Sequence, residues 1–461
     1  MSVAKTAVAA VRQLFGTDGI RGVANSEPIT CETTLRLGRA LVHSCQRSNV
    51  QRPRIVVGRD TRISGDMLEC ALTAGICSAG GDALLAGIVP TPAVAYLTRT
   101  LQANAGAVVS ASHNPFQDNG LKFFDTTGFK LPDDAEQGIE RLVLSGEVSA
   151  PTTSAAALGT ARGIDDAGQR YIEFLRALAP PGMPFKGVRV AIDCAHGAAY
   201  SVGPELFSRL GADVTALGAA PDGTNINREA GATHPQRLQE AVCAAQAHVG
   251  VALDGDADRV ILVDEHGEIV DGDEVLAIAA ADMLVRGTLK NGTVVATVMS
   301  NLGLEVALRA CGARLVRVQV GDRCVVEEMR QHGYNLGGEQ SGHLIFLDHG
   351  TTGDGLLAAL QVLRLMVERQ RPLSELKRAM TRFPQVLLNV AVKARRDLEG
   401  VEPVKQTIAR IRAALNDRGR VLVRYSGTEP LVRVMVEGED GDIVQAYADE
   451  IAAVIRAALA T

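Results

Sequence analysis

A strand–helix–strand pattern occurs three times along the chain, and this repeat constrains the fold more than any other feature. Each copy opens with an apolar run that ends in a polar turn, at residues 54–60, 188–193 and 293–300. A helical stretch and a second strand led by glycine follow, at residues 81–86, 211–216 and 312–317. Alternating strands and helices indicate βαβ units and mostly parallel sheets. The repeat therefore predicts three tandem α/β units, each of about 100 residues or more.

A different pattern begins near residue 385. The tail is typical of a short strand, a helix at 402–415, two paired strands and a terminal helix at 442–459, with Asp442 as the N-cap of that last helix. We therefore expect a small α+β domain after the three α/β units. The fold predicted is an α/β protein with mixed, mostly parallel sheets and four domains, at residues 1–163, 164–270, 271–382 and 383–461.

Composition excludes several classes of function. The chain has 461 residues, too long for one core, and its formal charge of −6 includes no basic patch for nucleic acid or an anionic membrane. Tryptophan is absent and aromatic residues make up 3%, so platforms for stacking bases are not expected. No apolar run approaches the roughly 18 residues of a membrane span. The eight cysteines form no C-x-x-C pair, so we expect a cytoplasmic protein without a disulfide framework or zinc site.

A candidate nucleophile follows the third strand of the first unit. The apolar run 105–109 ends in the loop Ser110-Ala-Ser-His-Asn-Pro115. The Asn-Pro pair turns the backbone out of helix or sheet, which leaves the Ser112 hydroxyl in a loop at the carboxyl end of a strand. Open α/β sheets bind their ligands at that edge. The alternative is an ordinary turn whose serine and asparagine side chains satisfy local backbone groups.

Lys122 lies inside the next apolar strand, which is an unusual position for a lysine. Desolvation there would lower the pKa of its amine toward a value that is useful in acid/base chemistry. The alternative is a surface lysine of which only the aliphatic stem is buried, and the spacing alone does not separate the two.

Three aspartates at alternate positions, Asp254, Asp256 and Asp258, follow an apolar strand of the second unit. Carboxylates this close repel one another when buried, unless a cation lies between them. A divalent ion with oxygen ligands, such as Mg²⁺, relieves that repulsion. One alternative is a calcium loop of the EF-hand type with Glu265 at its twelfth position, although Arg259 then occupies the position that requires glycine. The other alternative is a solvated acidic turn.

Two glycine-punctuated loops carry groups that suit a phosphosugar. Residues 15–22 expose backbone amides that can approach an anion, and Arg21 adds a charge. Residues 337–343 bring together Glu339, Ser341 and His343, a set of donors and acceptors suited to sugar hydroxyls. Ordinary turns are the alternative for both loops.

A phosphate cradle is predicted at residues 424–430. A forked guanidinium, two hydroxyls and a glycine that frees backbone amides are the groups that bind phosphate. The candidate residues are Arg424, Ser426, Gly427, Thr428 and, nearby, Arg433. A plain hairpin turn is the alternative.

Taken together, these stretches resemble the α-D-phosphohexomutase superfamily, and the resemblance extends from Phe15 to beyond Arg433. The motifs that carry it are Phe15-Gly-Thr-Asp-Gly-Ile-Arg-Gly22, Gly338-Glu-Gln-Ser-Gly-His343, Thr351-Thr-Gly-Asp-Gly355 and Arg424-Tyr-Ser-Gly-Thr-Glu-Pro430. The resemblance implies four domains around a central cleft, with one fold shared by the first three. It also implies a homodimer and an enzyme that moves a phosphoryl group between O1 and O6 of a hexose phosphate.

The resemblance further implies a role for each candidate residue. Ser112 is expected to carry a phosphoryl group as phosphoserine. One Mg²⁺ is expected to bind a phosphoserine oxygen and the side chains of Asp254, Asp256 and Asp258. Lys122 is expected to move the proton of the sugar hydroxyl with support from His113, while Arg21 and Arg259 stabilise charge. The sugar and its second phosphate are expected to bind the other candidates, which are Glu339, Ser341, His343, Arg424, Ser426, Gly427, Thr428 and Arg433.

Within the superfamily the motifs favour an aminosugar, for instance through Gln340, where the mannose and glucose enzymes tend to carry methionine. The implied reaction interconverts glucosamine 6-phosphate and glucosamine 1-phosphate, with glucosamine 1,6-bisphosphate as primer and intermediate, and feeds UDP-N-acetylglucosamine synthesis. The C-terminal domain is expected to close as a lid about a hinge near Phe383 and Pro384. The alternatives are activity on mannose or glucose phosphates, a non-catalytic phosphosugar-binding protein and a Mg²⁺-dependent phosphatase.

Overall fold

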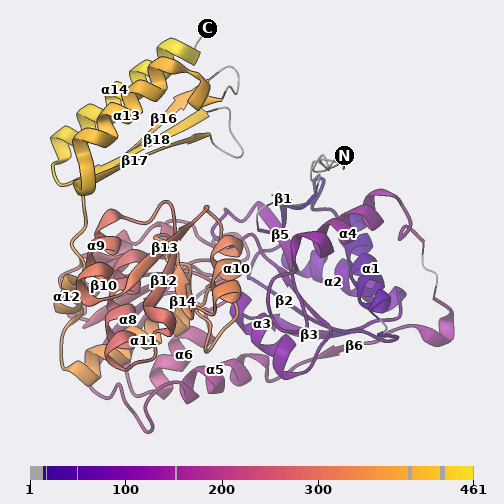
Figure 1. Ribbon diagram of the computed structural model, residues 1–461. Coiled ribbons are helices and arrows are strands. Elements are labelled where there is room, and N and C mark those ends of the chain that lie inside the picture. Colours follow the sequence, from indigo (N-terminus) through magenta and orange to yellow (C-terminus); the bar gives the residue numbers. More distant parts are fainter. Residues whose placement is uncertain are drawn as a thin grey trace. The chain divides into compact units, whose positions relative to one another are not determined.

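The computed structural model describes residues 14–16, 18–48, 50–150, 153–392, 397–425 and 431–459. The chain divides into two compact units, whose elements are labelled in Figure 1. The first unit contains residues 1–298 and 316–377, and the second contains residues 299–315 and 378–461. The first unit therefore holds most of the three predicted α/β repeats, and the second holds the predicted α+β domain.

The sheets of the three α/β repeats share one strand order. In each sheet the first strand lies between the second and the third, and a fourth strand follows the third. The third strand is parallel to the first, whereas the fourth is antiparallel to the third. From first to fourth, the strands are β2 (Arg54–Arg59), β3 (Asp82–Ile88), β4 (Ala105–Val109) and β5 (Asp118–Phe124); β7 (Arg189–Asp193), β8 (Asp213–Leu217), β9 (Val249–Leu253) and β10 (Val260–Asp264); and β12 (Thr293–Thr297), β13 (Arg314–Val318), β14 (Leu336–Gly338) and β15 (Leu344–Phe346). The prediction of tandem α/β units with mixed, mostly parallel sheets is confirmed.

Short strands extend two of these sheets, and helices connect their strands. The added strands are β1 (Ile20–Val23) and β6 (Ala161–Gly163) in the first sheet and β11 (Ile269–Val270) in the second. The α-helices of the repeats are α1 (Cys31–Arg47), α2 (Gly65–Ser78), α3 (Thr91–Thr100), α4 (Asp133–Leu144), α5 (Ala167–Ala177), α6 (Val202–Arg209), α7 (Gln236–Ala244), α8 (Gly272–Val285), α9 (Leu302–Cys311), α10 (Asp322–His332), α11 (Gly355–Arg369) and α12 (Leu373–Leu376). Single 3-10 turns are η1 (Ala155–Ala157), η2 (Gly231–Thr233), η3 (Lys290–Gly292) and η4 (Lys377–Ala379).

The central strands of the repeats are buried along their whole length. Every residue of β4, β9 and β12 is buried, as expected for strands covered by helices on both faces. Several helices begin at a side-chain cap, as where Thr30 accepts from Thr33 N before α1 and Asp271 forms a capping box before α8. Buried strands and capped helices together make a rigid support for the loops at the strand ends. No helix among the described residues combines the length and apolar character that a membrane span requires.

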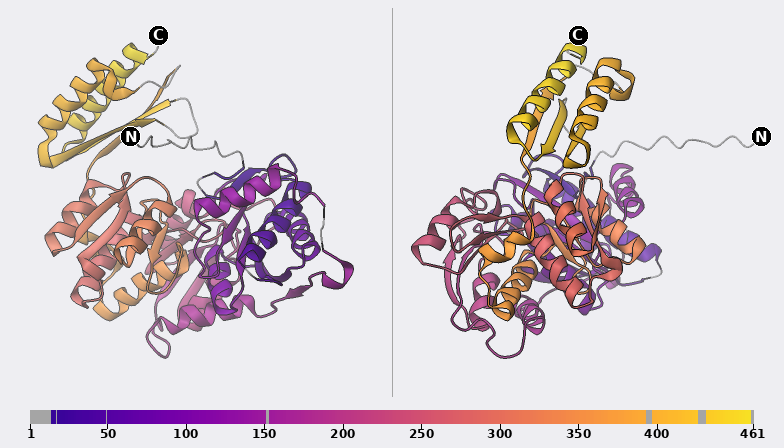
Figure 2. Two further views of the ribbon diagram at one scale, coloured as in Figure 1. Left: turned by 45° about the vertical axis from the view of Figure 1, so that its right-hand side comes forward. Right: turned by 60° about the vertical axis from the view of Figure 1, so that its left-hand side comes forward.

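The second unit contains the predicted α+β domain. Its antiparallel sheet has the order β16 (Gln385–Ala391), β18 (Leu431–Gly438), β17 (Gly419–Tyr425), and α13 (Glu402–Leu415) and α14 (Gly441–Leu459) cover one face of it (Figure 2). Short turns η5 (Leu398–Gly400) and η6 (Asn416–Arg418) flank α13. The prediction of Asp442 as the N-cap is wrong, because Asp440 Oδ1 accepts from the backbone N–H groups of Asp442 and Ile443. The helix begins one residue earlier than expected, which places Asp442 in its first turn.

Candidate active site

The loops singled out in the three repeats occupy equivalent positions, and the first unit brings them together. Each loop connects the third strand of its sheet to the antiparallel fourth strand, at the edge where open α/β sheets bind ligands. Ser112 Oγ donates to Asp254 Oδ2 at 2.6 Å, which joins the first loop to the second. The third loop joins them through His343, whose Nδ1 lies 3.7 Å from Asp258 Oδ1. The predicted nucleophile and the predicted metal ligands are therefore neighbours.

Ser112 has an uncommon backbone conformation. Its φ angle is +52°, in the left-handed region that residues other than glycine seldom adopt, and the residue is fully buried. Such a conformation persists only where the surroundings impose it, and it is often found at functional sites. Gly255 allows the two loops to approach, because a Cβ atom there would lie 2.5 Å from the carbonyl oxygen of Ser112. The contact between the two loops thus depends on glycine.

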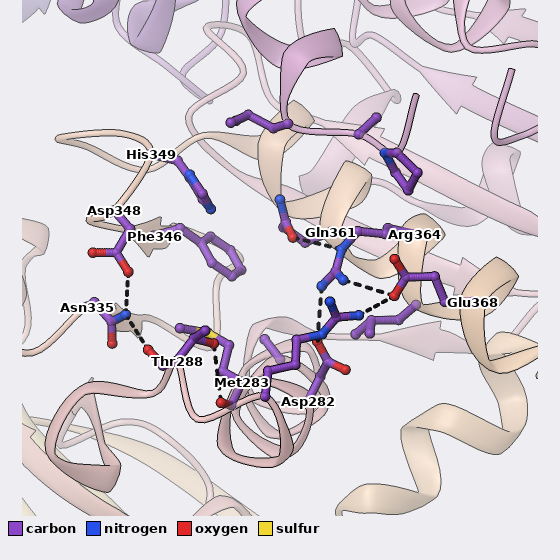
Figure 3. A pocket seen from close by; sticks show the side chains of 16 residues that line it. Asp282, Met283, Thr288, Asn335, Phe346, Asp348, His349, Gln361, Arg364 and Glu368 are labelled. Carbon is purple, nitrogen blue, oxygen red and sulfur yellow. Dashed lines mark hydrogen bonds and ion pairs between the residues drawn. The ribbon is translucent and has the colours of Figure 1, made fainter. Parts of the chain in front are cut away.

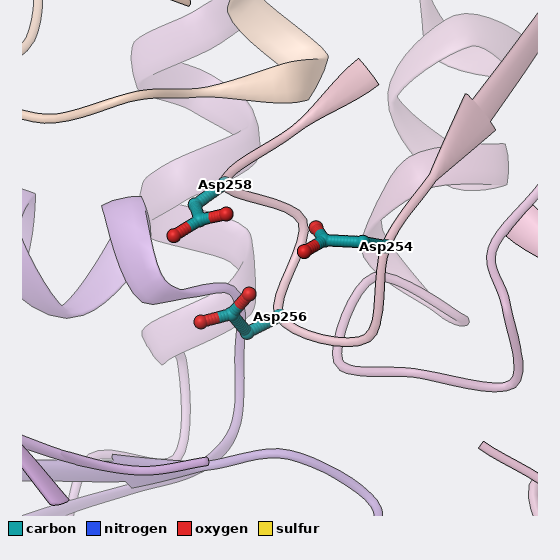
Figure 4. Close-up of side chains that lie close together, drawn as sticks. All are labelled: Asp254, Asp256 and Asp258. Atoms are coloured by element: carbon teal, nitrogen blue, oxygen red, sulfur yellow. The ribbon is translucent and has the colours of Figure 1, made fainter. Parts of the chain in front are cut away.

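The carboxylates of Asp254, Asp256 and Asp258 converge on one point (Figure 4). Each offers one oxygen within 4.8 Å of the others, all three residues are buried, and Asp256 Oδ1 has no hydrogen-bond partner. Burial and the charges of Asp258 and Asp256 raise the pKa of Asp254 to about 8. An unpaired buried oxygen and three mutually repelling acids fit a divalent cation with oxygen ligands. Neither alternative holds, because the turn is not solvated and Glu265 accepts instead from Ser374 N.

Lys122 is buried beside this cluster. On β5 it lies opposite Val108, and its Nζ is 2.9 Å from Asp256 Oδ2, 3.3 Å from Asp258 Oδ2 and 3.2 Å from Asp18 Oδ2. A surface lysine is thereby excluded, but the expected lowering of its pKa is wrong. Burial does favour the neutral amine, yet the three carboxylates outweigh burial and raise the pKa of Lys122 well above its ordinary value. The described side chain is therefore an ammonium ion.

His113 and two arginines lie next to Ser112. Arg259 donates from its guanidinium to His113 Nδ1 at 2.6 Å, and its backbone N–H donates to Asp254 Oδ1 at 3.2 Å. Burial, with the charges of Arg259 and Arg21, lowers the pKa of His113 to about 4, so its imidazole is neutral near pH 7. Arg21 forms an ion pair with Asp18. It also lies 3.4 Å from Asn114 Oδ1 in the loop at residues 110–117, called the serine loop below. A neutral imidazole thus lies 3.4 Å from the Ser112 hydroxyl, and the guanidinium groups of Arg259 and Arg21 contact His113 and Asn114 of the same loop.

The predicted sugar-binding loop divides into an accessible part and a buried part. Ser341 is exposed, and Glu339 is half-buried and accepts from Gly321 N at 3.2 Å. His343 is only 2% exposed, and its Nε2 accepts from Gly353 N at 3.1 Å. Any side chain at Gly353 would collide with the imidazole, because a Cβ atom there would lie 2.4 Å from Cε1. Glu339 and Ser341 can thus reach a ligand, whereas His343 lies behind the loop against Asp258.

The sequence around this site belongs to a known protein family. Models of the phosphoglucomutase/phosphomannomutase family match nearly the whole chain: α/β/α domain I at residues 12–149, domain II at 169–267, domain III at 271–383 and the C-terminal domain at 387–454. The chain belongs to this family. It is therefore an enzyme of the phosphohexomutase type, and the carboxylate cluster fits the metal site of such an enzyme.

Relatives and solved structures of the family cover almost all of the chain. It is 56% identical to a phosphoglucosamine mutase of Anaeromyxobacter sp. (strain Fw109-5), over 97% of this chain and 96% of that one. It is 55% identical to the phosphoglucosamine mutase of Sorangium cellulosum (strain So ce56), over 96% and 92%. A family protein from Burkholderia thailandensis has the same fold, with a TM-score of 0.80 at 24% identity over 96% and 97%. So does N-acetylphosphoglucosamine mutase from Aspergillus fumigatus, solved with GlcNAc-6P and magnesium, with a TM-score of 0.68 at 19% identity over 97% and 96%.

Several residues of this family site have no counterpart in the sequence-based prediction. Thr91 donates from Oγ1 to Asp256 Oδ2 at 2.7 Å, and Asp18 lies beside Lys122. Arg62 donates to the carbonyl of Ser112, as does Asn227 at 2.8 Å. Asp18 lies in the glycine-punctuated motif at residues 15–22, and Arg62 follows the polar turn after the first strand of its repeat, which is the sequence signal for these two residues. That signal names no partner, because the partners lie far away along the chain.

The predicted phosphate cradle of this family member lies in the second unit. Arg424 on β17 is directly opposite Arg433 on β18, and burial together with the charge of Arg433 lowers the pKa of Arg424. Like charges directly opposite each other destabilise a strand pair unless another group compensates them, and a bound phosphate would do so. Ser426, Gly427 and Thr428 lie outside the described residues. The cradle as a whole stays a prediction.

A cavity of about 500 Å³ lies elsewhere in the first unit, between α8, α11 and the strand β15 (Figure 3). Its charged groups bind one another: Asp282 accepts from Arg286 and Arg369 as well as Arg364, and Arg364 also pairs with Glu368. Asn335 and Asp348 are paired in the same way. Among the described residues, no buried polar side chain of this wall lacks a hydrogen-bond partner as Asp256 Oδ1 does. We therefore interpret the cavity as a gap between packed helices and not as a second site.

Proposed function

We propose that the protein is a phosphoglucosamine mutase, which interconverts glucosamine 6-phosphate and glucosamine 1-phosphate through a phosphoserine and a 1,6-bisphosphate. The observation that carries this proposal is the 2.6 Å hydrogen bond from Ser112 Oγ to Asp254, inside a cluster of carboxylates suited to a cation. The identity of its relatives, at 55% and 56% over nearly the full length, supports the aminosugar as substrate. The four domains would be residues 1–163, 164–270, 271–382 and 383–461.

In this proposal Ser112 carries the phosphoryl group. The P–Oγ bond of phosphoserine breaks as a new P–O bond forms to O1 or O6 of the sugar, and overall the proton of that hydroxyl is transferred to the released Ser112 Oγ. Asp254, Asp256 and Asp258, with a phosphoserine oxygen, would hold one Mg²⁺, which supplies charge neutralisation at the equatorial oxygens when bound. The ammonium of Lys122 would neutralise charge on the phosphoryl group. Because the side chain is protonated, Lys122 would act first as an acid, giving its proton to the released Ser112 Oγ, and would then accept the proton of the sugar hydroxyl.

The neighbouring arginines would stabilise the same negative charge on the phosphoryl group. Arg259 would orient the neutral His113, which lies 3.4 Å from Ser112 Oγ, and Arg21 would assist from its contact with Asn114. Glu339 and Ser341 would bind sugar hydroxyls, with His343 behind them. Arg424, Ser426, Gly427, Thr428 and Arg433 would bind whichever phosphate is not reacting.

The cycle requires the bisphosphate to turn in the site before the second transfer. Its contacts should then be nearly symmetric about the ring, and water must be excluded while it turns. The C-terminal domain would act as the lid, with its hinge near Phe383 and Pro384. A cytoplasmic homodimer with glucosamine 1,6-bisphosphate as primer completes the proposal.

Intact mass is the decisive test of the phosphoserine. Wild type and Ser112→Ala are incubated with glucosamine 1,6-bisphosphate and Mg²⁺ and weighed before and after. We expect wild type to gain about 80 Da in step with mutase activity, and Ser112→Ala to gain nothing and to be inactive. An unmodified but active wild type, or an active Ser112→Ala, would refute the mechanism.

Substrate comparison tests the choice of sugar. Turnover is measured on glucosamine, mannose and glucose 6-phosphates with matched 1,6-bisphosphate primers. We expect the highest kcat/KM on glucosamine 6-phosphate. A preference for mannose or glucose phosphate would contradict the proposed substrate but not the phosphoserine cycle. The protein would then be a phosphomannomutase or phosphoglucomutase, the activities for which the family is named. Steady release of inorganic phosphate without a primer would instead indicate a phosphatase.

A further inference from the structure

Arg62 lies in the turn after β2, and its guanidinium is fully buried. Its Nε–H donates to Asp60 Oδ2 at 2.9 Å. Its other N–H groups donate to four backbone carbonyls of a single loop, those of Ser112 and Asn114 (each 2.9 Å), Asp118 (3.0 Å) and Pro115. A guanidinium has five N–H groups in a planar fork, so every one of them is used.

The same ion pair reaches Ser112 from both sides. On one side, Arg62 donates directly to the Ser112 carbonyl. On the other side, Asp60 accepts from Ser110 Oγ at 2.6 Å, and Ser110 Oγ accepts from Ser112 N at 3.0 Å. The N–H and the C=O of Ser112 are therefore both tied to the pair of Asp60 and Arg62. Ser112 is also the residue of this loop with a left-handed φ angle, which needs such restraint.

The second α/β repeat contributes to the same restraint. Asn227 donates from Nδ2 to the carbonyls of Ser112 at 2.8 Å and Asn114 at 3.0 Å, two of the acceptors that Arg62 uses. The serine loop is thereby held between a cation of the first repeat and an amide of the second. The N–H groups of Arg62 are all used by Asp60 and by backbone carbonyls, so any effect on the reaction must pass through the backbone of the loop.

We propose that Arg62 is a positioning residue for phosphoryl transfer: by gathering four carbonyls of the loop it fixes the backbone of Ser112 and so aims Oγ at the carboxylate cluster. The inference rests on the proposed function, because the aim of Oγ matters only if Ser112 carries a phosphoryl group. Lysine at this position keeps the charge, but its three N–H donors are on one nitrogen and cannot reproduce the planar five-donor fork of arginine. The loop would then remain folded with a less precise aim.

The test compares Arg62→Lys with Arg59→Lys. Arg59 is the last residue of β2, and its side chain contacts Asp66, Glu69 and the Asp60 carbonyl but no residue of the serine loop. For both variants we would measure kcat and KM on glucosamine 6-phosphate with Mg²⁺ and primer, and the rate at which phosphoserine forms by intact mass. We expect kcat and the phosphorylation rate of Arg62→Lys to fall about 100-fold, with KM within about threefold, since small misplacements have effects of that order. Arg59→Lys should keep kcat within about twofold.

A folded Arg62→Lys variant with kcat within about threefold of wild type would overturn the proposal, whatever its unfolding temperature. If that variant does not fold, Ser110→Ala decides, because it removes one hydroxyl from the other side of the restraint. We expect its kcat to fall about tenfold, and a change below about twofold would overturn the proposal. The two proposals fail separately: a wild type that never gains phosphate contradicts the proposed function, whereas a variant phosphorylated as fast as wild type contradicts only the role of Arg62.

Discussion

The first unit contains two buried acidic sites that differ in how their charge is balanced. Asp282, on α8, has both carboxylate oxygens bound by arginines, and the pKa of this residue is lowered although burial alone would raise it. Asp254, Asp256 and Asp258 face one another. Among the described residues, Lys122 and Arg259 are the lysine and arginine that form ion pairs with them. The chain thus neutralises a buried carboxylate with its own cations at one site and leaves carboxylates in excess at the other. The excess indicates a cation that the chain itself does not supply.

The backbone is also regular at one of these sites and strained at the other. Asp282 lies within a regular helix, whereas the carboxylate loop and the serine loop both contain a residue other than glycine with positive φ, Ala257 at +57° and Ser112 at +52°. Strained residues of this kind are retained where geometry matters more than stability. We therefore interpret balanced charge on regular backbone as a structural contact between helices, and unbalanced charge on strained backbone as the mark of the candidate active site.

The largest expected effect is on activity. Asp254→Asn removes a proposed metal ligand that also accepts a hydrogen bond from the Ser112 hydroxyl, so we expect kcat to fall by about 1,000-fold or more. The free energy of unfolding without metal should not fall, and should rise by roughly 1–3 kcal/mol at pH 7, because burial and its neighbours disfavour the ionised carboxylate. Steady-state kinetics and urea unfolding in EDTA would check this. A variant that loses stability and keeps its activity would reverse our assignment of the two sites.

Mg²⁺ should stabilise the protein through the carboxylate cluster alone. At a concentration about 100 times the dissociation constant, a ligand that binds only the folded state adds about 2.7 kcal/mol. We expect this increase for wild type and for Asp282→Asn, and none for Asp254→Asn. Thermal unfolding with increasing Mg²⁺, set against Ca²⁺ and against EDTA, is the measurement. Equal stabilisation of all three proteins would show that the ion binds elsewhere.

Asp282→Asn should have the opposite profile to Asp254→Asn. Three arginines lose their common anion, which we expect to lower the free energy of unfolding by about 1–3 kcal/mol. The loss stays below that of a fully buried ion pair, because Arg286 and Arg369 are 41% and 46% exposed and can turn to water. Chemical unfolding and kcat of the folded protein would be compared with wild type. A large fall in kcat at unchanged stability would connect this contact between helices to catalysis.

The positions of Ser112 and the three aspartates could be predicted from the sequence, because the patterns that place them are local. Ser112 and the three aspartates each follow an apolar strand, and equivalent loops of repeated units meet at equivalent strand ends. The rest depends on contacts between distant residues. Lys122 is charged because pairing of β1 with β5 brings Asp18 beside it, and no local pattern contains that pairing. The role of Arg62 likewise depends on where four carbonyl groups point.

The smallest expected effect is on the pH dependence of stability, where Asp282 and Asp354 should have opposite signs. Burial raises the pKa of Asp354, which caps α11 and accepts from Tyr171, to about 6 in the folded state, against about 3.9 in an unfolded chain. The folded protein then binds more protons between pH 4 and 6, so this residue should lower stability as the pH rises through that window, by at most about 1.4 kcal/mol per pH unit.

Asp282 has a lowered pKa, so its stabilisation is complete above the unfolded value of about 4 and is lost as the pH falls below it. Urea unfolding of wild type, Asp354→Asn and Asp282→Asn between pH 3 and 8 would separate the two. The advantage of wild type over Asp282→Asn should shrink toward pH 3, whereas the difference between wild type and Asp354→Asn should change between pH 4 and 6 and stay constant above. Parallel curves for all three proteins would mean that neither carboxylate changes its pKa between the folded and unfolded states.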